Sequence, residues 1–216
     1  MINVIITFTG KHTKERESAM YKELIADLEN GTTRARTVSD AESLADKVLS
    51  IGGYMGISGP IPIVKIAKEF GITTFKERNM PVDVAGNIFV GGTTEEIYHT
   101  DKVIVVGDGE EYFHQRFIIA HELAHYLMDY LGNSDYRDKR LLFSKTYPKQ
   151  HHNSDEEIRA DRFAAELLMP KVAFLKEYVY ADRKSNGNDI YVLTYLSTLF
   201  KTKKSSIERR IIEVLD

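Results

Sequence analysis

Apolar side chains recur with helical spacing over much of the chain. The strongest pattern covers residues 117–131, which are apolar almost all round and therefore predict a buried helix. Residues 11–30 predict a charged amphipathic helix, and residues 39–49 a second one with Ser39 as N-cap and Glu42 completing a capping box. Further helices are expected at 155–169, 171–180, 190–200 and 205–215.

Residues 72–106 carry short runs of β-branched and aromatic residues bounded by turn residues. They predict four short strands, at 72–75, 86–90, 96–99 and 103–106. We therefore predict an α+β fold that is mostly helical, with a small twisted β-sheet flanking the apolar helix. An edge of this sheet could hold an extended peptide as an added strand.

A glycine-rich run at residues 51–62 interrupts the helical pattern. We place a boundary there and predict a helical extension at 1–59, a core at 60–184 and a C-terminal helical pair at 185–216. The last pair has the order of a helix-turn-helix. Because its basic run holds only three lysines, a hairpin that covers the core is favoured over a DNA-binding unit.

The apolar helix contains the sequence His121-Glu122-Leu123-Ala124-His125. Histidines four residues apart lie about 40° apart around a helix, so both imidazoles can reach one ion. This H-E-x-x-H pattern is typical of zinc sites, and Glu122 is placed to accept a proton from a water on the metal. The alternative is two core histidines bonded to carbonyls. Because an unpaired buried carboxylate costs several kcal/mol, we favour a metal site and predict metal-assisted peptide hydrolysis.

The third ligand is expected from the helix at 155–169. On a helical wheel Glu157 lies within its apolar face, and Asp161 follows one turn later on the same face. Glu157 is therefore the candidate ligand, and Asp161 could accept the second N–H of a ligating histidine. Glu156 lies at the edge of that face and is a weaker candidate. The wheel places four other charged residues on the opposite side: Asp155, Arg159, Arg162 and Glu166.

Residues 126–156 lie between His125 and Glu157, and their second half is polar enough for a lid or specificity loop. His151 and His152 are alternative metal ligands. Together with Tyr147 and His114 they are also candidates to stabilise an oxyanion, although each is more simply explained as a solvated or structural residue.

Two motif blocks resemble the ImmA/IrrE family of zinc metallopeptidases, namely residues 115–125 and 157–170. The resemblance extends over about residues 60–216. It implies a zincin-like metallopeptidase core with His121, His125 and Glu157 as zinc ligands, as in gluzincins. It further implies Glu122 as catalytic base and Asp161 as hydrogen-bond partner of a ligand. This chain departs from the usual family pattern at three positions: Ile118, Ala124 and Arg159.

The composition of the chain excludes some kinds of site and ligand. The chain has 216 residues, a net charge of −3 and no cysteine, so disulfides and thiolate ligands are excluded. The acidic balance gives no general attraction to nucleic acid. Neither a secretory signal nor a membrane span is predicted, and we expect a cytoplasmic protein.

The resemblance implies a narrow substrate, a helix-turn-helix transcriptional repressor whose cleavage derepresses mobile-element or stress genes. A rival hypothesis is a non-catalytic regulatory module that sequesters a repressor or toxin partner. A second rival is a DNA-binding regulator with a metal-sensing core, which the net charge disfavours.

Overall fold

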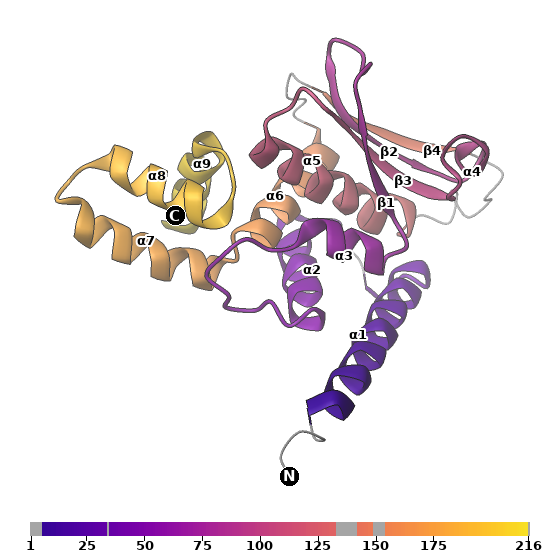
Figure 1. Cartoon of the computed structure of the whole chain (residues 1–216), viewed down its shortest axis with the longest axis horizontal. Helices are drawn as coiled ribbons and strands as arrows, with labels where there is room; N and C mark the ends of the chain where they lie inside the picture. The colour runs from indigo at the N-terminus through magenta and orange to yellow at the C-terminus, as the bar shows by residue number, and fades with distance from the viewer. Residues whose placement is uncertain (1–5, 34, 133–141, 149–153, 216) are drawn as a thin grey trace.

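A computed structural model describes residues 6–33, 35–132, 142–148 and 154–215 (Figure 1). The fold is α+β and mostly helical with a small mixed sheet, as predicted. The helices are α1 (Ile6–Glu29), α2 (Val38–Ile51), α3 (Ile63–Glu69), α4 (Thr94–Tyr98), α5 (Tyr112–His125), α6 (Asp155–Leu168), α7 (Lys171–Ser185), α8 (Asp189–Phe200) and α9 (Lys204–Leu215). A single π-helical turn, η1 (Tyr126–Tyr130), continues α5. None of the described helices combines the length and apolar character that a membrane span requires.

The sheet has four strands in the order β1-β3-β2-β4. Strand β1 (Thr73–Glu77) runs parallel to β3 (Lys102–Gly107), whereas β2 (Val84–Val90) is antiparallel to both β3 and β4 (Phe143–Pro148). Helix α5 packs against β2, β3 and β4, and α6 packs against α5. The sheet and α6 therefore flank the helix that carries the histidine pair (Figure 1).

Helix α5 approaches the sheet most closely at Gly86. A Cβ added there would lie 2.2 Å from Cγ2 of Ile118 and 3.2 Å from the carbonyl oxygen of Val105. Only glycine fits between this helix and this strand without a shift of one of them. Gly86 thus sets the depth at which α5 lies on the sheet.

Replacing Gly86 by alanine is expected to lower the free energy of unfolding by about 1–3 kcal/mol, because overpacking displaces a buried side chain or the strand. Urea denaturation monitored by circular dichroism measures this change. Gly109→Ala is the matched control, because its added Cβ meets nothing within 4 Å. Equal stability of the two variants would show that α5 tolerates a larger separation.

One predicted strand is wrong and one strand was missed. Residues 96–99 lie in helix α4 and the residue that ends it, His99, rather than in a strand. Glu95 and Glu96 in the first turn favour this helix through its dipole, and the apolar run was too short to define a period. Strand β4 was missed because it is an edge strand with only Phe143 and Tyr147 buried, so its polar positions suggested a loop.

The caps and lengths of some helices also differ from the prediction. Thr37, not Ser39, caps α2: its side chain accepts from the Asp40 amide at 3.1 Å, and the Asp40 carboxylate accepts from the Thr37 amide at 2.9 Å. The same pattern of a hydroxyl followed three residues later by an acid occurs twice here, two residues apart. Helix α7 continues to Ser185, five residues beyond its predicted end.

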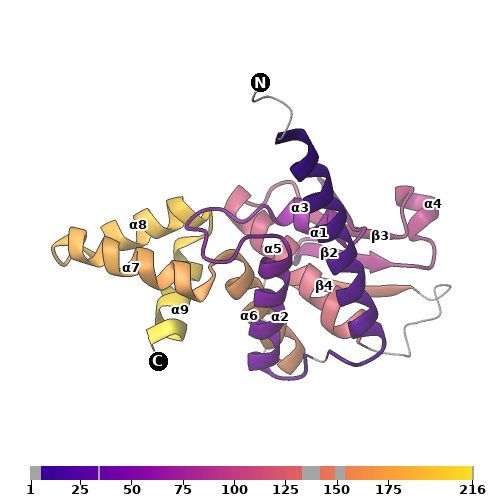
Figure 2. The same ribbon diagram turned by 90° about the horizontal axis from the view of Figure 1, so that it is seen from below.

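The last three helices pack on one another and are held to the rest by buried arginines. Arg210 in α9 pairs with Glu166 in α6, and both side chains are buried. Arg116 in α5 donates to the carbonyls of Ile61 at 2.7 Å and Lys201 at 3.2 Å. Figure 2 shows α2 and α6 side by side next to α9. The division into three parts at 59 and 184 stays a prediction.

Candidate metal centre

Two neighbouring helices bring three donor groups together. Nε2 of His121 lies 3.0 Å from Nε2 of His125, and these nitrogens lie 3.0 and 3.3 Å from the two Glu157 carboxylate oxygens. Among the described residues, these three side chains form a group whose ligand atoms all lie within 4.8 Å of one another. The cluster joins the end of α5 to the first turn of α6, where Ser154 caps the helix by accepting from the Glu157 amide.

Each histidine of the cluster has an aspartate on its other nitrogen. Nδ1 of His121 lies 2.9 Å from Asp161, as the wheel predicted, and Nδ1 of His125 lies 2.5 Å from Asp129. An Nδ1–H donated to a carboxylate leaves a lone pair on Nε2, which then faces the cluster. The donor set of two imidazoles and a carboxylate fits a divalent cation in the zinc class.

Asp129 was missed by the sequence analysis, although it lies four residues after His125. The signal was present, because residues i and i+4 of a helix are neighbours. The helix predicted at 117–131 already includes Asp129, but the partner of a ligating histidine was sought only on the second helix. Two arginines were also missed: Arg159 lies 3.6 Å from Asp129, and Arg209 lies 3.2 Å from Asp161.

We expect Asp129→Asn to weaken zinc affinity by about 10- to 100-fold, because the amide holds the His125 ring less firmly and makes it a weaker base. Competition with a fluorescent chelator measures the dissociation constant. Asp27→Asn serves as control, since Asp27 lies in α1 and pairs with Lys47. An unchanged zinc affinity in Asp129→Asn would mean that His125 is held by packing alone.

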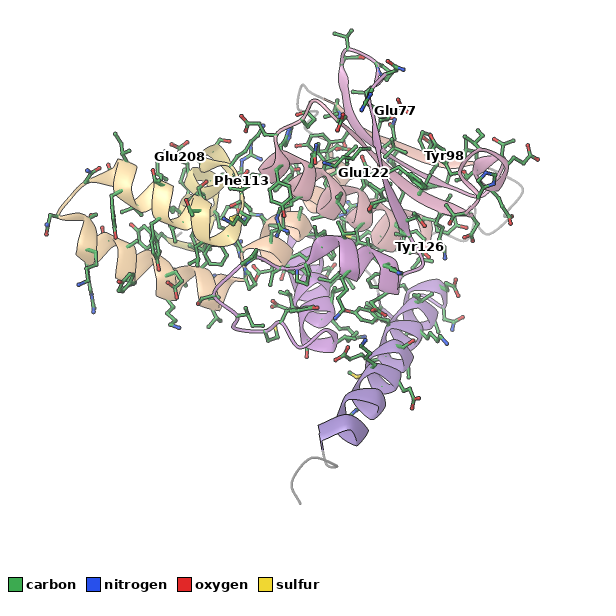
Figure 3. The ribbon with its side chains drawn as sticks, in the orientation of Figure 1. Glu77, Tyr98, Phe113, Glu122, Tyr126 and Glu208 are labelled. Atoms are coloured by element: carbon green, nitrogen blue, oxygen red, sulfur yellow. The ribbon has the colours of Figure 1, made fainter. Side chains whose placement is uncertain are left out.

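Glu122, which is labelled in Figure 3, is completely buried, and its pKa responds to the nearby charges of the cluster. Neither of its carboxylate oxygens has a hydrogen-bond partner of good geometry among the described residues, although the backbone of Tyr147 lies close enough to lower its pKa. Burial raises the pKa of Glu122 to about 7, against the opposing influence of His125 and His121. A buried carboxylate without partners is costly unless a cation or an ordered water lies beside it. The environment of Glu122, like the cluster of three donors, therefore fits a metal site.

The electrostatics of the metal-free cluster favour a proton on His125. Burial alone would lower the pKa of His125, but hydrogen bonds to Asp129 and Glu157 outweigh it and raise the pKa to about 9. Burial likewise would raise the pKa of Glu157, but hydrogen bonds to both histidines hold it below its usual range. A metal ion must therefore displace a proton from His125.

The proton on His125 makes both the stability of the metal-free protein and its zinc affinity depend on pH. The raised pKa of His125 stabilises the metal-free protein below about pH 6.5, and this contribution is lost as pH rises toward 9. Zinc needs the neutral ring, so its affinity should increase by up to about tenfold per pH unit over that range. The difference in Tm between zinc-loaded and metal-free protein should widen from pH 6.5 to 9. A constant difference would contradict a protonated His125.

The other candidate residues fall into two groups. Tyr147 in β4 is buried, and its ring centre lies 4.6 Å from that of His121; burial raises its pKa, so its hydroxyl stays protonated. His114 lies 5.7 Å from Tyr147 between ring centres, and burial lowers its pKa. Glu156 is exposed, pairs with Lys145 and is not part of the cluster. His151 and His152 lie outside the described residues.

Fold and site together define a metallopeptidase-type protein. The model of the family described as IrrE N-terminal-like domain (Peptidase_M78) matches residues 67–211, which is more than half of the chain. The chain belongs to this family, in agreement with the resemblance found in the two motif blocks. A search of curated proteins gave no match.

Proposed function

We propose that this chain is a zinc-dependent endopeptidase, with His121, His125 and Glu157 as zinc ligands and Glu122 as catalytic base. The observation that carries the proposal is the convergence of three donor groups next to a completely buried carboxylate, Glu122, to which no described side chain donates a hydrogen bond. Zinc is the metal we propose because imidazole and carboxylate donors without cysteine are typical of catalytic zinc sites.

The chain's own residues suit peptide hydrolysis. A zinc ion would act as a Lewis acid that polarises the scissile carbonyl and lowers the pKa of the attacking water. Glu122, buried beside the proposed ligands, would take a proton from that water and carry it to the leaving amine. The ring of Tyr147 lies beside that of His121, and we propose that its hydroxyl donates a hydrogen bond to the developing oxyanion.

The substrate that we propose is a helix-turn-helix transcriptional repressor, cleaved in the cytoplasm to derepress mobile-element or stress genes. Support for this comes from the family resemblance. The rival function, a regulatory module that only sequesters a partner, has no need of a completely buried acid beside the cluster. Glu122 therefore favours the enzyme over the binding module.

The test combines zinc content with cleavage of repressors encoded beside this gene. Zinc-loaded protein should cut at least one of them into two fragments, as resolved by mass spectrometry. Metal-free protein should not cut it, and restored zinc should return the activity. Stable binding of a repressor without cleavage, in the presence of bound zinc, would favour the sequestering module instead.

A further inference from the structure

A cavity of about 230 Å³ lies beside the metal cluster, between α6 and the beginning of α9. Its walls include Tyr147 and Asp161, which contact and hydrogen-bond His121. Phe117, Ala165 and Met169 form the apolar part of its lining. The cavity thus adjoins the site proposed for catalysis through the two residues that contact His121, and it is large enough for one amino-acid side chain.

Both acids that line this cavity are already engaged. Asp161 accepts from His121 and pairs with Arg209 at 3.2 Å. Glu213 pairs with Arg162 at 3.2 Å and with Arg210 at 3.5 Å. Because each of these carboxylates faces two donors, neither attracts an incoming cation strongly.

Both cations that line the cavity keep donors available. Arg209 uses one N–H for Asp161, and 54% of its side chain is exposed. Lys203 has no carboxylate within ion-pair distance in the described parts of the chain. Its charge still reaches the cavity, since it adds to the effect of burial in lowering the pKa of His114. A side chain that enters the cavity therefore meets the positive charges of Arg209 and Lys203.

We propose that this cavity, which we call the α9 subsite, receives an aspartate or glutamate side chain of the substrate next to the scissile bond. Arg209 and Lys203 are its specificity-determining residues. The inference rests on the proposed peptidase function. Arg209 also pairs with Asp161, the hydrogen-bond partner of the proposed ligand His121. An exposed ion pair of this kind contributes little to the stability of the site. The effect of Arg209 therefore falls on substrate preference rather than on zinc affinity.

The first test profiles cleavage sites. Zinc-loaded full-length protein is incubated with a pool of peptides from denatured proteins, and the cut sites are read by mass spectrometry. We expect acidic residues to be enriched about fivefold or more at one position adjacent to the cut. The double variant Lys203→Gln/Arg209→Gln should lose this enrichment. Lys204→Gln, the neighbouring exposed lysine outside the lining, should keep it.

The second test measures binding without turnover. A dye-labelled peptide from the profile, with Glu or Gln at the selected position, is titrated into the Glu122→Gln protein. The Glu peptide should bind about fivefold more tightly, and Arg209→Gln should remove the difference while Arg209→Lys keeps part of it. Zinc content, measured alongside, should be the same in all variants.

The outcomes separate the two proposals. Cleavage by the native protein without acidic enrichment, or the same enrichment in the double variant, would overturn the α9 subsite and leave the peptidase intact. Cleavage of neither a peptide nor a repressor encoded beside this gene by zinc-loaded native protein would overturn the proposed function and the subsite with it.

Discussion

Glu122→Gln is expected to bind zinc like the native protein and to lower kcat by about 10²- to 10⁴-fold, the range for loss of a general base. Glu122 is not part of the cluster of three donors, so its replacement by glutamine removes no ligand. Glutamine preserves the shape of the completely buried side chain but cannot accept the proton. Zinc content by mass spectrometry and kcat with a cleaved peptide measure the two effects.

Glu96→Gln is the control for this variant, because Glu96 is an exposed residue of α4. It should retain both zinc and activity. Full activity of Glu122→Gln would identify another residue as the base. Loss of zinc from Glu122→Gln would instead place this carboxylate among the ligands.

Glu157→Ala is expected to weaken zinc binding by more than the 10- to 100-fold that outer hydrogen-bond partners contribute, since it removes one of three donors. Activity should be lost with the metal. Native protein should gain thermal stability on addition of zinc, because a ligand that binds only the folded state stabilises it. Glu157→Ala should show no such gain at the same zinc concentration.

The neighbouring acid provides the control for the ligand variant. Glu156→Ala changes an exposed residue on the same helical turn and should leave zinc affinity within about twofold. If Glu156→Ala weakened zinc binding and Glu157→Ala did not, the wheel would have chosen the wrong one of two adjacent acids. Stabilisation of both variants by zinc would show that the two histidines bind zinc without a third ligand from α6.

The arrangement of the candidate site followed from helical spacing, because the two helices that carry it are long and their periods are well defined. His121, His125 and Glu157 were expected to converge, and the structure brings their donor atoms together. Their roles as ligands stay predictions. Asp161 was placed by the same wheel, and its hydrogen bond to His121 follows from its position one turn after Glu157.

The burial of Glu166 and the strand β4 could not be predicted, because both depend on contacts between segments distant in sequence. The wheel placed Glu166 on the polar side of α6, but this side chain is buried, because Arg210 of α9 lies against it. Strand β4 is defined by its pairing with β2, which no local pattern reveals. Helical wheels describe one element at a time and cannot show which polar face a later element will cover.

The buried pair of Glu166 and Arg210 links the evolution of two distant segments. Helix α6 carries Glu157 near its start and Glu166 near its end, so a charge left alone at the end strains the helix that holds the metal cluster. Losing one partner of such a pair costs about 3–5 kcal/mol, whereas an apolar pair of similar volume is tolerated. Positions 166 and 210 should therefore co-vary among relatives. A chimera that takes α9 from a relative should fold stably only if residue 166 of α6 comes from the same relative.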